Sequence, residues 1–153
     1  MIRLFIALTF FFCLCIKADN SYKRSSFLYN SYSTNTNVGF YTGKYCKTNI
    51  DHVVSLKDAH DSGAKGWSQN LKELFANDKK NHVSACYKIN SSKGSATPKH
   101  FLRRSNDGKG LDYEIISFCK YLNIYYKTKI KYNLTFKNND PSLFIKCNLN
   151  ILK

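Results

Sequence analysis

The chain of 153 residues carries 24 Lys and Arg against 10 Asp and Glu, a formal net charge of +14, and 43% of it is hydrophobic. This hydrophobic fraction excludes wholesale disorder, and the length suits one domain. The positive charge favours a polyanionic partner such as nucleic acid, an anionic membrane or a sulfated glycan, although a skewed gene composition would also enrich lysine.

The N-terminus predicts export. Arg3 gives a short basic start, and residues 4–16 are apolar except for Thr9. This run is shorter than the ~20 residues that span a bilayer, but it suits the core of a signal peptide. We therefore expect residues 1–18 to be a signal peptide that ends at Ala18. The mature protein is expected to be secreted, to the periplasm or outside the cell, without stable membrane association.

Four cysteines follow the predicted signal peptide. An even number in an exported protein predicts up to two disulfides, in any of three pairings. None of these cysteines belongs to a Cys-x-x-Cys pair, so a structural zinc site is not expected. The four are Cys46, Cys86, Cys119 and Cys147.

The first half of the mature chain predicts an arm, a strand and two helices. Residues 19–37 are rich in Ser, Asn, Thr and Tyr and predict a loosely structured arm, which leaves 38–153 as the domain proper. Residues 39–45 predict a turn and residues 50–54 a strand. A helix is expected from Leu56 to Ser62, and another over residues 67–75 with Ser68 as its N-cap. The inward face of the second helix is expected to hold Trp67, Leu71, Leu74 and Phe75.

The second half predicts a strand over residues 82–89, a short helix over 95–102 and a loop over 106–110. The clearest helical periodicity covers residues 111–126, and the remaining residues are weakly patterned. Together these elements predict an α+β fold. The expected apolar stripe of the longest helix consists of Leu111, Ile115, Phe118, Cys119, Leu122 and Tyr126.

The order of the central motifs resembles a known family. A strand with Asp51-His52 is followed by an insertion, a second strand and the sequence Asn-x-x-Lys-Gly. This order resembles the HNH (His-Asn-His, ββα-metal) endonuclease superfamily, in the branch related to the C-terminal nuclease domain of GmrSD-type restriction enzymes. The resemblance implies a ββα-metal motif, a short β-hairpin plus a helix, embedded in additional helices. It is carried by residues 50–59, 61–64, 67–68, 75–78, 81 and 90–94, and by the helix around Cys119.

The resemblance also implies roles for individual residues. Asp51 and Asn90 would hold a divalent metal, with Mg²⁺ as the first choice and Mn²⁺ as the second, because these ions prefer hard oxygen ligands. His52 would be the general base that activates water, and Asn81 would brace the loop that orients it. Since adjacent strand residues point to opposite faces, a strand end or kink is expected at Asp51-His52.

Three basic residues are expected to contact substrate phosphates. Lys93 follows Asn90 in the motif, and Arg103 and Arg104 extend the basic surface. An arginine pair is, however, more often only a solvated face. His82 is the second candidate for the base.

These residues predict a secreted metal-dependent endonuclease that hydrolyses phosphodiester bonds of DNA, with RNA as a further substrate. Low sequence specificity is expected, because no sequence-reading module is present. The alternative is a non-enzymatic basic protein that binds nucleic acid or another polyanion. A membrane-active toxin is disfavoured, since no basic amphipathic helix of the required kind follows the signal. The oligomeric state and the substrate strandedness stay open.

Overall fold

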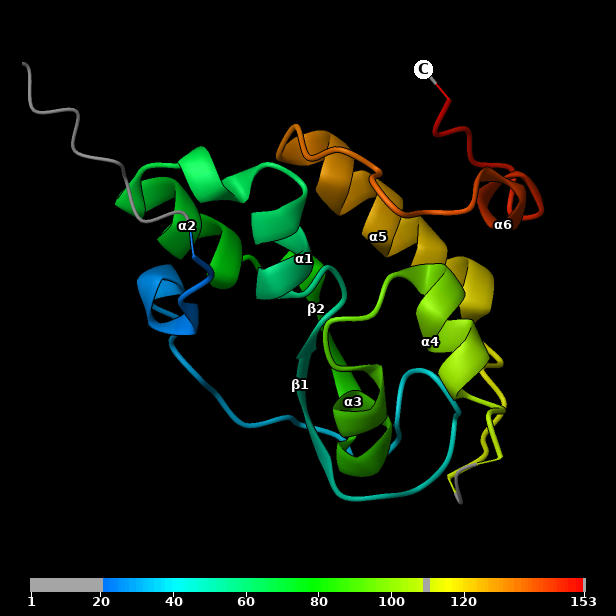
Figure 1. Cartoon of the computed structure of the whole chain (residues 1–153). Coiled ribbons are helices and arrows are strands. Elements are labelled where there is room, and N and C mark those ends of the chain that lie inside the picture. The colour runs from blue at the N-terminus through cyan, green and yellow to red at the C-terminus, as the bar shows by residue number, and fades with distance from the viewer. Residues whose placement is uncertain (1–20, 109–110, 153) are drawn as a thin grey trace, which may run out of the picture.

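The computed structural model describes residues 21–108 and 111–152, so the predicted signal peptide lies outside the described residues. An antiparallel pair of strands, β1 (Thr48–His52) and β2 (His82–Cys86), lies at the centre, with helices on both sides (Figure 1). The register runs from Thr48 opposite Cys86 to His52 opposite His82. The protein is therefore a mixed α and β protein with a small two-stranded sheet and several helices, as the sequence predicted.

The insertion between the strands holds two helices that begin as predicted. Ser55 caps α1 (Leu56–Asp61) by accepting from the amide of Asp58, and Ser68 caps α2 (Gln69–Ala76) by accepting from Leu71. Leu74 is 60% exposed, so its predicted inward position was wrong. The short 3-10 helices η2 (Ala64–Gly66) and η3 (Lys79–Asn81) complete the insertion. The insertion ends at His82, which lies opposite His52 at the end of β1.

The helix α3 (Tyr87–Lys93) follows β2 without a loop. The predicted strand over residues 82–89 was therefore too long. The register ends with Thr48 opposite Cys86, and Tyr87 already begins α3. The order strand, strand, helix places Asn90 on a helix beside the hairpin (Figure 1).

The longest helix, α5 (Phe118–Lys131), begins seven residues later than the expected start at Leu111. In the preceding segment Tyr113 and Ile115 are buried while Asp112, Glu114 and Ile116 are exposed. This alternation is the period of an extended chain, and it overrode the helical pattern assumed there. The helices α4 (Pro98–Arg104) and α6 (Pro141–Ile145) each start with proline in the first turn.

A buried ion pair joins α1 to α5. The carboxylate of Asp58 accepts from the ammonium of Lys129 at 3.0 Å and from the hydroxyl of Tyr125 at 2.7 Å. Lys129 is fully buried, and its ammonium also donates to Ser62 and to the carbonyl of Thr135. Because every donor of this buried ammonium has an acceptor, the pair specifies how the two helices dock.

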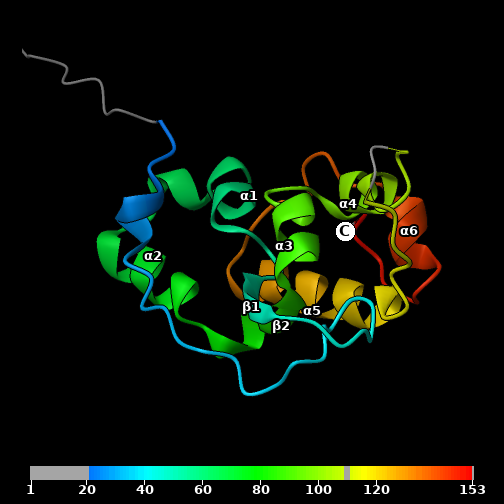
Figure 2. The same cartoon turned by 90° about the horizontal axis from the view of Figure 1, so that it is seen from below.

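Within residues 21–37 the N-terminal arm contains little regular secondary structure, and contacts with the insertion anchor it. Its 3-10 helix η1 (Arg24–Phe27) buries Phe27 against Phe75, with ring centroids 6.2 Å apart. The side chain of Asn77 holds the carbonyl of Leu28 and the amide of Asn30. The arm then runs along the hairpin, as Figure 2 shows.

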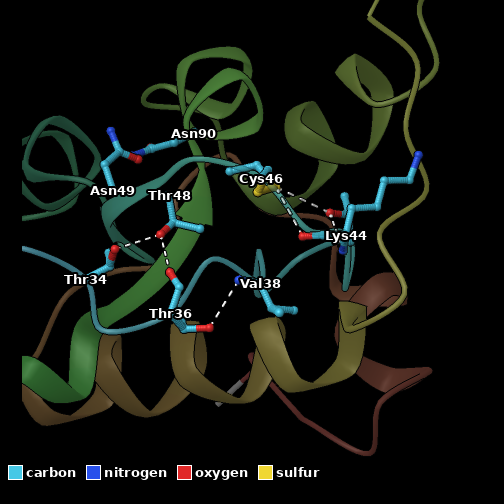
Figure 3. Close-up of a disulfide and its surroundings, with 10 residues drawn as sticks. Thr34, Thr36, Val38, Lys44, Cys46, Thr48, Asn49 and Asn90 are labelled. Carbon is cyan, nitrogen blue, oxygen red and sulfur yellow. Dashed lines mark hydrogen bonds between the residues drawn. A yellow bond between two sulfur atoms is a disulfide. The ribbon is translucent and has the colours of Figure 1, made fainter.

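Two disulfides cross-link the chain. Cys46–Cys86 joins the segment before β1 to the end of β2 (Figure 3), and Cys119–Cys147 joins α5 to the residues after α6. A Cβ added to Gly39 would lie 2.4 Å from the sulfur of Cys86, so this position requires glycine. The prediction of two disulfides is confirmed, and the pairing is now assigned.

Reduction of both disulfides is expected to destabilise the protein strongly. The bridges close loops with sequence separations of 40 and 28, and the chain-entropy relation assigns about 3–4 kcal/mol to each. Urea unfolding with and without a reductant measures the change. The double variant Cys119→Ser/Cys147→Ser separates the second bridge from the first. An unchanged unfolding midpoint after complete reduction would contradict the expectation.

Candidate functional site

One cleft brings together the three residues of the predicted catalytic centre. It has a volume of about 370 Å³ and lies between the end of β1, the start of α1, α3 and the arm. Asp51 and His52 enter it at the end of β1, where strand alternation stops, as expected for this dipeptide. Its lining residues are Tyr22, Arg24, Ile50, Asp51, His52, Ser55, Leu56, Lys57, Asn90, Gly94 and Ser95.

The carboxylate of Asp51 is held by two buried donors. Tyr41 donates its hydroxyl to Oδ2 at 2.5 Å, and the ammonium of Lys93 donates to Oδ1 at 3.0 Å. Burial raises the pKa of Asp51, while the charge of Lys93 and the bond from Tyr41 oppose that shift. Burial, aided by the charge of Asp51, raises the pKa of Tyr41 well above 10, so its phenol stays a donor. The orientation of Asp51 is therefore fixed by protein groups alone.

Lys93 does not have the predicted position. Its side chain is fully buried, and its ammonium also donates to the carbonyl of His52 at 2.9 Å. A group enclosed in this way cannot contact a substrate phosphate in this structure, so the predicted substrate contact is corrected. The ammonium of Lys93 is buried because it pairs with the buried carboxylate of Asp51, and either charge would be costly to bury alone. Lys93 instead holds the Asp51-His52 dipeptide through these two hydrogen bonds.

The hydrogen bonds of His52 define its tautomer. Its Nε2 lies 2.7 Å from the carbonyl oxygen of Ala76, and since a carbonyl only accepts, Nε2 must carry the hydrogen. Nδ1 is then the unprotonated nitrogen that can accept a proton. Burial lowers the pKa of His52 to about 3, so the ring is neutral at pH 7. Edge-on contacts with Tyr29 and His82, at centroid distances of 4.7 and 4.4 Å, fix the ring plane.

His82 shares the anchor of His52 but differs in its second nitrogen. Its Nε2 lies 3.0 Å from the same Ala76 carbonyl, and its Nδ1 lies 3.0 Å from the hydroxyl of Tyr32. Both ring nitrogens are thus engaged. The geometry favours His52 over His82 as a proton acceptor.

Asn81 and Asn90 have distinct surroundings. Asn81 is fully buried, and its side-chain amide accepts from the backbone of Val54 at 2.8 Å and donates to it at 3.0 Å. It thereby braces the residues that follow His52. Asn90 donates its amide nitrogen to Asn49 Oδ1 at 2.9 Å and to the carbonyl of Ile50 at 3.3 Å. Because the nitrogen faces these acceptors, the amide oxygen is the end that remains for a ligand.

The two arginines lie apart from this cleft. Arg104 donates to the carbonyls of Ser92 and Lys93 at 3.0 and 2.9 Å, so it caps the end of α3. Arg103 is exposed, and both arginines line a separate hollow of about 390 Å³. The structure does not bring either guanidinium to Asp51, His52 or Asn90.

Sequence reasoning missed the aromatic residues that hold the site. Tyr41 orients Asp51, while Tyr29 and Tyr32 of the arm cover the two histidines. Nothing in the sequence separates these from the other tyrosines, of which the chain has 11 in total.

The donor set of the cleft fits a divalent cation. Across residues 21–108 and 111–152, no group of three or more His, Cys, Asp or Glu gathers in a metal-binding arrangement. Asp51 and Asn90 instead offer one carboxylate and one amide oxygen. A carboxylate has about four lone-pair positions, so Asp51 can accept from Tyr41 and Lys93 and still bind an ion. Mg²⁺ retains several waters and needs few protein ligands.

The pKa of His52 makes the stability of the metal-free protein depend on pH. Its folded pKa of about 3 lies below the unfolded value of 6.5, so the unfolded chain binds more protons between these values. The contribution of His52 to the free energy of unfolding is fully present above pH 6.5. Below that pH it falls by up to about 1.4 kcal/mol for each pH unit. Urea unfolding in EDTA at pH 7 and pH 5 measures this loss. His52→Gln should lose clearly less, and equal losses in both proteins would contradict the assignment.

No protein-family profile matches the chain, and no solved structure matches it. The chain is 28% identical over 95 residues to an "Uncharacterized secreted protein" of Arthroderma benhamiae. The aligned region covers 61% of the chain and 42% of the relative. The chain thus spans less than half of that protein's length. In the part of the chain that the structure describes, no helix is long and apolar enough to cross a membrane. The similarity to a secreted protein agrees with the two disulfides and with the predicted signal peptide: the chain is a secreted, disulfide-bonded protein.

Proposed function

We propose that this secreted protein is a metal-dependent endonuclease of the HNH type, which hydrolyses phosphodiester bonds of DNA, and of RNA, with low sequence specificity. The observation that carries the proposal is the convergence of Asp51, His52 and Asn90 on one cleft. Asp51 and His52 lie on β1 and Asn90 lies on α3, which is the element order expected for a ββα-metal motif. A protein that only binds polyanions has no need of this trio.

The proton-transfer role falls to His52. Hydrolysis requires a base that takes a proton from the attacking water. The Ala76 carbonyl keeps the hydrogen on Nε2, which leaves Nδ1 to accept that proton. A phosphate anion in the cleft raises the pKa of His52 towards neutrality, because nearby negative charge stabilises imidazolium. Tyr29 and His82 keep the ring from rotating while it does so.

Asp51 and Asn90 would hold the divalent cation, Mg²⁺ in the first instance and Mn²⁺ in the second. When bound, such an ion neutralises phosphate charge and stabilises the leaving oxygen. The chain contributes the orientation of its ligands. Tyr41 and Lys93 fix the carboxylate of Asp51, and Asn49 turns the amide oxygen of Asn90 away from the hairpin. Asn81 holds the backbone beside both.

The edge of the cleft suits a polyanion of varied sequence. Arg24 and Lys57 line it and are exposed, and the chain as a whole has a formal net charge of +14. Charge of this kind attracts the phosphate backbone without reading bases. Low sequence specificity follows.

Plasmid cleavage by the purified mature protein tests the proposal. Supercoiled DNA should be nicked and linearised with Mg²⁺, and EDTA should stop the reaction. Asn90→Ala should raise the Mg²⁺ concentration needed for the half-maximal rate, because one of two protein ligands is lost. Binding of DNA without cleavage in Mg²⁺ or Mn²⁺ would establish the non-enzymatic alternative, and cleavage unaffected by EDTA would exclude the metal.

A further inference from the structure

A second, more apolar groove lies on the other side of α3. Its volume is about 480 Å³, and its lining includes the disulfide Cys46–Cys86 and Ile89. Two tyrosines stand at its edge with unusually high exposure, 82% for Tyr45 and 58% for Tyr87. Within the described residues, neither ring packs against another aromatic ring. The residues that line the groove are Thr42, Lys44, Tyr45, Cys46, Lys47, Cys86, Tyr87, Lys88, Ile89, Leu111, Asp112 and Tyr113.

The groove is also positively charged. Three lysines line it, Lys44, Lys47 and Lys88, against one acidic residue, Asp112. All three lysines are exposed, and no ion pair joins them to an acid in the part of the chain that the structure describes. A ligand that matches this surface combines flat apolar rings with a regularly spaced negative charge.

The groove and the cleft are adjacent along two elements. On α3, Ile89 lines the groove and Asn90 lines the cleft; along β1, Lys47 precedes the strand at the groove and Ile50 faces the cleft. Figure 3 shows this arrangement, with Asn49 and Asn90 on one side of the disulfide and Lys44 on the other. A strand that leaves the cleft across α3 would enter the groove.

We propose that this groove is a subsite for single-stranded nucleic acid, in which unpaired bases stack on Tyr45 and Tyr87 while Lys44, Lys47 and Lys88 contact the phosphates. The inference rests on the proposed function and adds a substrate preference to it. Stacking on aromatic side chains is open only to unpaired bases and tolerates any sequence. The subsite therefore selects single strands, or frayed segments of a duplex, over an intact helix.

Binding of a fluorescent dT oligonucleotide in EDTA, followed by anisotropy, tests the subsite without cleavage. The double variant Tyr45→Ala/Tyr87→Ala should raise the Kd at least tenfold, in line with stacking losses of about 1–3 kcal/mol for each base. A blunt duplex should bind both proteins alike. Ile130→Ala/Ile145→Ala, which truncates two exposed residues of α5 and α6, is the matched control and should leave the Kd unchanged.

The lysines are tested by salt dependence. Replacing Lys44, Lys47 and Lys88 by alanine should lower the slope of log K against log salt by about 2, since each single-strand phosphate contact contributes about 0.7. The same change at the exposed Lys65, Lys127 and Lys146 should not. An unchanged single-strand Kd in the tyrosine variant, with its unfolding midpoint retained, overturns the subsite even if the wild type cleaves plasmid. A wild type that fails to cleave plasmid but shows the predicted Kd change overturns only the proposed nuclease.

Discussion

Replacing His52 by glutamine is expected to lower the rate of phosphodiester cleavage by about 10²–10⁴-fold, the usual contribution of a general base. Glutamine can still donate a hydrogen bond to the carbonyl of Ala76, but it has no basic nitrogen for the attacking water. DNA binding should change little, because the substitution removes no charge at pH 7. His52→Ala should lose as much activity, with an added loss of stability from the buried ring.

His82→Gln is the matched control, because His82 bonds the same carbonyl oxygen and packs against His52. Its cleavage rate should fall far less than that of His52→Gln, because His82 packs against the ring of His52 but takes no proton from the water. The measurement is a single-turnover plasmid assay with saturating Mg²⁺, alongside circular dichroism of each variant. If folded His52→Gln cleaves at the wild-type rate while His82→Gln does not, His82 is the base instead.

Local sequence signals predicted a helix or strand correctly where a polar cap or a strand pattern was the only pattern present. Ser68 marked the start of α2, and the strand around Asp51 formed with a shift of two residues. The predicted start of the longest helix was wrong because a helical and an extended periodicity overlapped there. Residues 111–115 alternate between apolar and polar side chains and also fit a helical stripe, and burial of Tyr113 and Ile115 selected the extended form. Tertiary packing decided between the two forms, and the local sequence alone could not.

The candidate site residues could be predicted from the sequence, but the residues that hold them in position could not. Asp51, His52 and Asn90 were named from motif order, and the fold gathers them in one cleft. Their partners were not accessible to the same reasoning. Tyr41 lies in a turn, Tyr29 in an arm expected to be loose, and the acceptor for His52 is a backbone carbonyl with no sequence signature.

Lys93 shows why residue type alone misleads. A lysine after a catalytic motif predicts a phosphate contact, since lysines are almost never fully buried unless paired. Here it is paired, to Asp51, and fully buried. A surface lysine and a buried structural lysine have the same sequence signal, and only the position of the carboxylate distinguishes them.

Lys93→Met is therefore expected to act on stability. Methionine fills most of the space of the side chain but leaves the carboxylate of Asp51 buried with Tyr41 as its remaining donor. Breaking a buried pair from one side costs about 3–5 kcal/mol, because an uncompensated charge remains. Urea unfolding in EDTA at pH 7 measures the loss. Lys88→Met makes the same change at an exposed position of the same helix and should stay within about 0.5 kcal/mol of the wild type.

A double-mutant cycle with Asp51→Asn separates the ion pair from simple loss of packing. In the absence of the carboxylate, Lys93→Met should cost much less than in the wild type, because no charge is left uncompensated. A coupling free energy of about 2 kcal/mol or more between the two substitutions is expected. Additive losses would show that Lys93 acts through packing alone. A stable Lys93→Met protein whose DNA affinity has a reduced salt slope would return Lys93 to the substrate contact that the sequence motif first predicted.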